Sequence, residues 1–473
     1  MPDSPAPSGS DAPTADAIEH AVLRAITPSP EMMERVRTAT RLLVERAESA
    51  VRNRGSPVVR CLVAGSAARG TYLGDRLDID LFLLFRTDVP REVLEREGLA
   101  LGSEVLTDPV TKYAEHPYRH GTFEGIEVDA VPGYAVDDPS RPMSAVDRTP
   151  FHQEYLTQRQ TPEMVAQVRL TKQFLRALGV YGSEARTGGF SGYLVELLVL
   201  RFGRLRELLA AARGWRIPVR LLSSPTAAPR TPDDVALLLD DPVDPNRNVA
   251  TALTRRNLGR FILAAGHYLD HPSARAFDLP PRPALAPADA KRRLAERRTH
   301  VAILGMPRPD LVDDILYPQL AKAERALADE AERLGFQVVG TASAAGEGRV
   351  VVLLEVAQRE LPGVKVQDGP PPGIDRVGQF LEKWTDPAAA VLQGPYVTAD
   401  GRLAVETLRS TRGIEELLTE AFEHLALGRD LRHELGPASF FRSLEDTDPS
   451  PELSRGLADL LDKRLPWLPP RPR

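Results

Sequence analysis

Hydrophobic positions in the first 150 residues change between helical and strand spacing. Residues 30–54 carry apolar side chains at helical spacing, with Ser29 as a favourable helix start and Gly55 as a stop. Short apolar runs predict three strands, at residues 58–65, 77–85 and 122–134. A short helical turn is expected over residues 66–73, between the first two strands. This part of the chain is therefore expected to mix helices and strands.

Between residues 161 and 280 the pattern becomes mainly helical. Residues 162–179 form an amphipathic stretch with Pro162 at its start and Gly179 at its end. Two longer stretches follow, and each predicts one helix, at residues 188–214 and 249–270. A Pro- and Ala-rich segment, residues 281–290, is typical of a linker.

Beyond this linker the pattern mixes strands and a long helix again. Strands are expected at residues 300–306, 336–344 and 349–357, and a helix at residues 310–335. The Pro/Ser/Ala-rich N-terminus is typical of a disordered tail. A chain of 473 residues is too long for one hydrophobic core. We expect four parts: a tail (1–16), a mixed α and β domain (17–158), a helical domain (159–280) and an α+β region (281–473).

Composition narrows the class of protein. Hydrophobic residues make up 42% of the chain and charged residues 27%, as in ordinary globular proteins. The one cysteine, Cys61, excludes an internal disulfide and fits a reducing cytoplasm. The sequence has no apolar run of membrane-spanning length and no secretory signal, so we expect no membrane contact and a cytoplasmic location. A net charge of −6 argues against a surface that is basic throughout, although a segregated basic patch can still bind nucleic acid.

Two aspartates interrupt the apolar run at residues 77–85. Alternate residues of a strand point to the same face, so Asp78 and Asp80 are expected to project together. Two ionised carboxylates on one face of a buried strand repel each other unless a cation lies between them. Asp129, on a later predicted strand, supplies a third carboxylate. These residues therefore predict a Mg²⁺ site, of the kind that activates a hydroxyl and stabilises a leaving pyrophosphate.

A Gly-Ser turn precedes the aspartates by twelve residues. Gly65 and Ser66 lie between a predicted strand and a helical turn, where backbone N–H groups and the Ser66 hydroxyl can bind an anion. Arg69, one turn further on, can reach the same phosphate. The simpler alternative is an exposed strand face and an ordinary turn. The order of strand, Gly-Ser turn, two-aspartate strand and third acidic strand favours the functional interpretation.

This order resembles the nucleotidyltransferase pattern of the DNA polymerase β superfamily. The segment GSAARGTYLGDRLDIDLFLLF (65–85) is similar to the signature of the archaeal-type, or class I, CCA-adding enzymes. Further segments share this resemblance, namely VDRTPFHQEYL (146–156), RLTKQFLRALGVYGSEARTGGFSGYLVELLV (169–199), DPVDPNRNVATAL (241–253) and LQGPYV (392–397). The resemblance implies an α+β fold with a polymerase-β-like nucleotidyltransferase head, a helical central nucleotide-binding domain and an α+β C-terminal RNA-binding region.

The resemblance also implies roles for particular residues. Asp78, Asp80 and Asp129 match the metal-binding catalytic carboxylates, although the family often has Glu where this chain has Asp78. Ser66 and Arg69 match triphosphate contacts. The residues that match contacts to the ribose and phosphates of the nucleotide are Thr149, His152, Lys172 and Tyr181. Arg247 matches an arginine that reads the base edge of CTP or ATP.

Several of these residues have structural alternatives. His152 is compatible with a hydrogen-bonded histidine beside a helix start, and Lys172 with a solvated helix face. Tyr181 is compatible with a core cap. Arg247 is compatible with an ion pair to Asp241 or Asp244 in the same loop.

The expected function is template-independent addition of C, C and A to the 3′ end of tRNA from CTP and ATP, with release of pyrophosphate. The acceptor arm of tRNA would be bound through its shape and phosphates, and the family resemblance allows a homodimer. One alternative is a poly(A)-type or oligonucleotide-synthesising nucleotidyltransferase. Another is an RNA-binding homologue that has lost catalysis.

Overall fold

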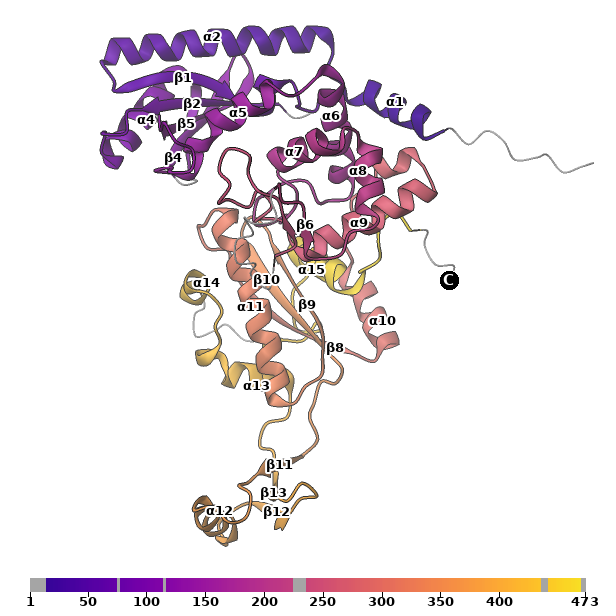
Figure 1. Ribbon diagram of the computed structural model, residues 1–473. Helices are drawn as coiled ribbons and strands as arrows, with labels where there is room; N and C mark the ends of the chain where they lie inside the picture. The colour runs from indigo at the N-terminus through magenta and orange to yellow at the C-terminus, as the bar shows by residue number, and fades with distance from the viewer. Residues whose placement is uncertain (1–13, 75–76, 114–115, 224–234, 435–440, 469–473) are drawn as a thin grey trace, which may run out of the picture. The chain divides into compact units, whose positions relative to one another are not determined.

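The structure is a computed structural model that describes residues 14–74, 77–113, 116–223, 235–434 and 441–468. The described residues form two compact units, the first from those within 14–280 and 465–468 and the second from those within 281–464 (Figure 1). The sequence places a tail at residues 1–16. Residues 1–13 of it lie outside the described residues, whereas Ala15 and Asp16 already belong to helix α1 (Ala15–Ile26).

A five-stranded sheet in the order β1-β2-β5-β4-β3 carries the first half of the first unit. Its strands are β1 (Val58–Ala64), β2 (Asp78–Phe85), β3 (Thr107–Tyr113), β4 (Pro117–Phe123) and β5 (Ile126–Tyr134). β2 and β5 run parallel, and the other neighbouring strands run antiparallel. The short helix α3 (Gly65–Arg69) follows β1 directly.

Helices α2 (Pro30–Arg54) and α4 (Arg91–Val105) cover one face of this sheet. Figure 1 shows α2 running along the strands. Ile79 and Leu81 of β2 point into this layer and are fully buried, because alternate residues of a strand share a face. Asp78 and Asp80 therefore lie on the opposite face, as the alternation predicts.

The strand predicted over residues 122–134 is confirmed over 126–134, as β5, but the prediction is wrong at its start, where residues 122 and 123 end β4. The chain forms a hairpin there, in which β4 and β5 pair antiparallel around a turn at Glu124 and Gly125. Both turn residues have positive φ, 51° and 70°. Two consecutive left-handed residues are what a tight hairpin turn requires, and Glu is an uncommon residue there.

Five further helices and α1 build the rest of the first unit around one apolar core. They are α5 (Thr149–Thr157), α6 (Pro162–Ala177), α7 (Gly192–Phe202), α8 (Leu205–Ala212) and α9 (Arg255–Asp270). The prediction of a single helix over 188–214 is wrong. The first helix, α7, begins only at Gly192 and ends before Gly203, which has a φ of 84°, and α8 follows as a separate helix. The helix predicted over 249–270 begins only at Arg255, where Thr254 caps it. The short strands β6 (Val219–Arg220) and β7 (Leu237–Leu238) pair in parallel.

The second unit contains a three-layered body and a smaller sheet. The larger sheet has the order β14-β8-β10-β9, and the smaller one has the order β11-β13-β12. Helix α11 (Asp313–Leu334) packs on one face of the larger sheet and helices α10 (Pro287–Arg297) and α15 (Pro451–Leu461) on the other. The strands are β8 (His300–Pro307), β9 (Val338–Ala345), β10 (Arg349–Val356), β11 (Val364–Asp368), β12 (Val391–Val397), β13 (Leu403–Leu408) and β14 (Phe441–Arg442), and the remaining helices are α12 (Arg376–Thr385), α13 (Ile414–Glu420) and α14 (Arg429–Glu434).

The predicted linker at 281–290 is only partly a linker, because α10 already begins at Pro287. The strands and the long helix predicted for this region are confirmed within a few residues. Among the described helices, none combines the length and the apolarity that a bilayer crossing requires.

Candidate active site

Four carboxylates share one face of the sheet in the first unit, which we call the acidic face: Asp78, Asp80, Glu127 and Asp129. β2 and β5 pair in parallel with Asp80 opposite Asp129 and Asp78 opposite Glu127. Paired residues on neighbouring strands point to the same side, so Asp78, Asp80 and Asp129 face away from α2 and α4. The sequence places the two aspartates of β2 together, and the register adds the third.

Asp80 lies directly against the Gly65 turn. A Cβ atom at Gly65 would lie 2.1 Å from the Asp80 carboxylate oxygen Oδ2, far inside any allowed contact, and Gly65 has a φ of 74°. Both facts require glycine at this position. The turn therefore brings Ser66, the next residue, to the edge of the acidic face, where it lies half-buried in α3.

The electrostatics of this face are unfavourable for the carboxylates alone. The pKa of Asp80 is raised to about 7, most of all by burial and then by the nearby carboxylates of Asp129 and Asp78. Burial also raises the pKa of Asp78, with Asp129 and Glu127 acting in the same direction. Arg69 opposes the rise at Asp80. Closely spaced carboxylates of this kind fit a divalent cation, which removes their repulsion and accepts oxygen ligands.

A histidine that the sequence reasoning missed holds one of these carboxylates. His120, on β4 opposite Asp129, lies with Nδ1 2.6 Å from the Asp129 oxygen Oδ1. In the part of the chain that the structure describes, no three His, Cys, Asp or Glu side chains already form a complete metal-binding set. The donor chemistry nevertheless fits a hard divalent ion, because every predicted ligand is a carboxylate oxygen. His120 could have been identified only from the β4–β5 hairpin.

The predicted phosphate contacts converge on a buried glutamate. Arg69 donates two hydrogen bonds to Glu196, at 2.7 and 3.1 Å, and also bonds Gln153. The Nζ atom of Lys172 lies 3.7 Å from the same carboxylate, and Thr71 donates to it at 3.0 Å. Glu196, on α7, is 1% exposed. Its contacts with Arg69 and Thr71 on one side and with Lys172 of α6 on the other join the mixed α and β part of the unit to the helices.

Two cations share this one buried anion. Burial would raise the pKa of Glu196, but Arg69 and Lys172 outweigh it and hold that pKa below its usual value. Burial lowers the pKa of Lys172 to about 8; Glu196 opposes this change, whereas the positive charge of Arg69 adds to it. Lys172 is 2% exposed, so the interpretation as a solvated helix face is wrong.

Tyr181 and Gly192 lie beside this group. A Cβ atom added at Gly192 would lie 3.3 Å from the Tyr181 hydroxyl and 3.9 Å from the Lys172 Nζ atom. Burial raises the pKa of Tyr181 to about 12, and Glu196 adds to the effect. The first residue of α7, Gly192, therefore lies next to both Tyr181 and Lys172, two of the residues predicted to contact the nucleotide.

The remaining predicted residues form a second group around Asp241. Thr149 begins α5, and His152 follows one helical turn later on the same side. His152 lies with Nε2 2.8 Å from the Asp241 oxygen Oδ2, and Arg247 donates to the same oxygen at 2.7 Å. The ion pair between Arg247 and Asp241 was one of the structural alternatives, and the structure contains it. Because the Arg247 side chain is still 37% exposed, the pair leaves room for a ligand contact.

The two groups are connected through Gln153 and Arg69, so all predicted site residues belong to one region of the first unit. The sequence reasoning missed Glu196, Gln153, His120 and Tyr193, whose hydroxyl donates to Asp241 at 2.9 Å. Glu196 had a detectable signal: it is the one charged residue in the apolar run GYLVELLVL.

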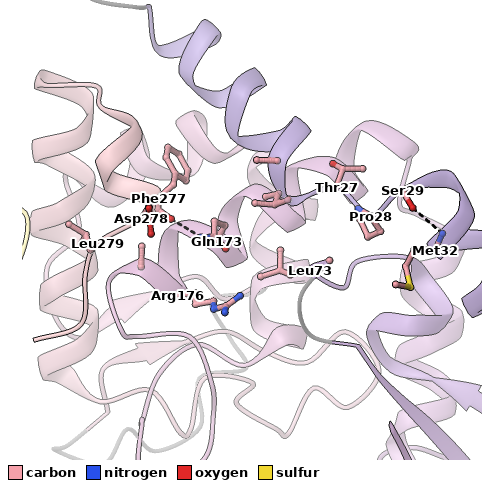
Figure 2. Close-up of a pocket in the computed structure, with 14 residues that line it drawn as sticks. Thr27, Pro28, Ser29, Met32, Leu73, Gln173, Arg176, Phe277, Asp278 and Leu279 are labelled. Atoms are coloured by element: carbon pink, nitrogen blue, oxygen red, sulfur yellow. Dashed lines mark hydrogen bonds between the residues drawn. The ribbon is translucent and has the colours of Figure 1, made fainter. Parts of the chain in front are cut away.

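A separate cavity of about 670 Å³ lies outside this region (Figure 2). It is bounded by the α1–α2 connection, α6 and the turn before Asp278. Figure 2 shows Gln173 bonding the carbonyl of Phe277 at its edge. None of the predicted site residues lines it.

A parallel strand pair bearing three carboxylates beside a Gly-Ser turn defines a nucleotidyltransferase. The family model of the nucleotidyltransferase domain matches residues 44–152, which confirms the polymerase-β-like head. Two further models match the rest of the chain: "tRNA nucleotidyltransferase, second domain" at residues 166–278 and "CCA-adding enzyme, C-terminal domain" at residues 297–439.

The chain belongs to the family of CCA-adding enzymes. It is 41% identical to the CCA-adding enzyme of Halobacterium salinarum, over 84% of this chain and 87% of that protein. It is 34% identical to the enzyme of Thermoplasma volcanium, over 87% and 90%, and 35% identical to that of Methanocaldococcus jannaschii, over 78% and 84%. A solved structure of Cid1, which is described as having an RNA terminal uridylyl transferase activity, matches 56% of this chain and 99% of its own at 14% identity, with a TM-score of 0.43.

Proposed function

We propose that this protein adds C, C and A to the 3′ end of tRNA without a nucleic-acid template. The tRNA 3′ hydroxyl attacks the α-phosphate of CTP twice and of ATP once, and pyrophosphate leaves each time. The observation that carries the proposal is the in-register placement of Asp80 and Asp129 beside the Gly65 turn, in a chain that belongs to the CCA-adding family.

We assign the catalytic role to Asp78, Asp80 and Asp129, with Mg²⁺ as their ion. Divalent metal use follows from the family, and the all-carboxylate donor set favours Mg²⁺. Bound there, Mg²⁺ would neutralise phosphate charge and lower the pKa of the attacking hydroxyl. His120 would orient the Asp129 carboxylate through its hydrogen bond.

We assign the triphosphate to the cationic group next to the acidic face. Arg69 and Lys172 carry two positive charges against the single charge of Glu196, so the group keeps a net charge of +1 for an anionic ligand. Ser66 and Tyr181 would add hydroxyl donors. Because Arg69 already lies close enough to Asp80 to affect its pKa, the phosphates would lie beside the catalytic carboxylates.

We assign ribose and base recognition to Thr149, His152 and Arg247. A guanidinium presents several N–H donors in a rigid plane and can distinguish the edges of cytosine and adenine from those of other bases. The 37% exposure of Arg247 supports a ligand-facing role. The homodimer and the cytoplasmic location expected from the sequence stay predictions, and sedimentation and cell fractionation would test them.

Extension of a tRNA transcript that lacks its CCA end tests the proposal. The transcript is incubated with Mg²⁺ and labelled CTP, labelled ATP or both, and products are read at single-nucleotide resolution. Two C additions followed by one A support the proposal. Long A tails would favour a poly(A)-type enzyme, and binding of tRNA without extension would favour a catalytically silent homologue.

A further inference from the structure

Asp241 is a fully buried carboxylate that binds side chains from three parts of the first unit. It lies between β7 and α9, and its exposed fraction is 0%. Its Oδ2 atom accepts Arg247 Nη1 at 2.7 Å and lies 2.8 Å from His152 Nε2 on α5. Its Oδ1 atom accepts the Tyr193 hydroxyl of α7 at 2.9 Å and the Val243 backbone N–H at 3.1 Å.

These four partners keep Asp241 charged in spite of its burial. Burial alone would raise its pKa, but His152, the Val243 N–H and Arg247 together hold the pKa of Asp241 at about 2. A buried charge that is fully hydrogen-bonded fixes its partners firmly, because losing any one of them leaves an uncompensated group. The His152 ring also stacks on the Tyr193 ring, with centroids 4.0 Å apart.

The consequence is that one N–H group of Arg247 is anchored on Asp241 while the side chain remains 37% exposed. A free arginine side chain samples many rotamers, and a fork discriminates between bases only when its plane is held in one orientation. The Asp241 bond supplies that orientation. The same carboxylate oxygen also fixes His152, so the two side chains hold one relative position.

We propose that Asp241 is a positioning residue that sets nucleobase selectivity by fixing Arg247 relative to His152. The proposal rests on the proposed function, in which Arg247 reads the base and His152 contacts the nucleotide. Asp241 itself is not expected to touch the nucleotide, because it is completely covered by its partners.

The test compares Asp241→Asn with Asp244→Asn in tRNA extension. An asparagine keeps the shape of Asp241 but turns one oxygen into a donor, which then faces the N–H of either Arg247 or Val243. Asp244 is a matched control, because it is a buried aspartate of the same loop that pairs instead with Arg148 at 2.8 Å. Thermal melting of each variant monitors folding.

We expect Asp241→Asn to lower kcat/KM for CTP about 10- to 100-fold. The reason is that a displacement of about 1 Å of the Arg247 guanidinium costs a factor of this size in rate. The preference for CTP over UTP and for ATP over GTP should fall with it, whereas Asp244→Asn should keep both preferences. Tyr193→Phe, which removes one bond to Asp241 and keeps the ring stack, should shift the preferences in the same direction by less. Unchanged preferences in a folded Asp241→Asn enzyme overturn the proposal.

A double-mutant cycle separates this inference from the proposed function. If Asp241 acts through Arg247, then Asp241→Asn should reduce selectivity little further in an Arg247→Ala background. Fully additive losses overturn the inference. If Arg247→Ala alone leaves nucleotide use unchanged, the assigned role of Arg247 fails instead, and the positioning role fails with it.

Discussion

Replacing Gly65 by alanine should disable the enzyme through Asp80. The new Cβ atom would lie 2.1 Å from Asp80 Oδ2, whereas an ordinary contact needs about 3.4 Å. The carboxylate must therefore move by about 1.3 Å, and a displacement of about 1 Å of a reacting or metal-binding group costs on the order of 100-fold in rate. The left-handed backbone adds about 1–2 kcal/mol of strain to the folded state.

The chain offers a control with the same strain and no contact. Gly55 also has a left-handed backbone, with a φ of 61°, and an added Cβ would meet nothing within 4 Å. In a urea titration Gly55→Ala should lose about 1–2 kcal/mol through backbone strain alone, and Gly65→Ala should lose more, because the contact with Asp80 adds to the same strain. In single-turnover extension with saturating CTP and tRNA, only Gly65→Ala should lose about 100-fold in rate. A Gly65→Ala enzyme that works at the wild-type rate would refute the reasoning, as would an equal loss in Gly55→Ala.

Three further outcomes follow from the charges at the site. Glu196→Gln should lower the free energy of unfolding by about 3–5 kcal/mol in urea, because it leaves Arg69 and Lys172 buried without their anion. Asp80→Asn should raise the melting temperature at pH 8 without metal. A pKa of about 7 in the folded protein, in place of 3.8, means that ionised Asp80 destabilises the fold by about 4 kcal/mol. This destabilisation is complete above pH 7 and absent below about pH 4. Mg²⁺ should abolish the difference in melting temperature between Asp80→Asn and the wild type. Deprotonation of Lys172 as pH rises through about 8 should raise KM for CTP, and Lys172→Arg should remove that rise; KM values that stay flat to pH 9.5 would contradict this.

Local patterns predicted the elements that carry the acidic face. Strict alternation in β2 separated Asp78 and Asp80 from Ile79 and Leu81, and the structure has that separation. The register that sets Asp80 beside Asp129 depends on strand pairing between distant segments. A single sequence gives no local signal for such pairing.

The errors of prediction also have local physical causes. The apolar spacing continues from α7 into α8, so the sequence predicted one helix. The positive φ of Gly203 ends α7 between them, and this break leaves no trace in the spacing of apolar residues. The hairpin before β5 was missed because Glu124 and Gly125 are not a common turn pair.

Ion pairs between residues far apart in the sequence could not be predicted from the sequence. Arg69 and Glu196 are separated by 127 residues. The sequence alone therefore did not indicate that the predicted phosphate contacts, Arg69 and Lys172, surround a buried glutamate. In contrast, Asp241 and Arg247 are six residues apart in one loop, and their pairing could be anticipated.

The central claim is that the carboxylates of the acidic face catalyse addition of both C and A. The most direct measurement compares Asp80→Asn with Asp88→Asn in extension of tRNA that lacks CCA and of tRNA that lacks only the terminal A. Asp88 is a suitable control, because it lies beyond the end of the same strand, β2, and its side chain is 63% exposed in an ion pair with Arg86. We predict that Asp80→Asn abolishes both additions while Asp88→Asn extends both substrates; C or A addition that survives in Asp80→Asn would contradict the claim.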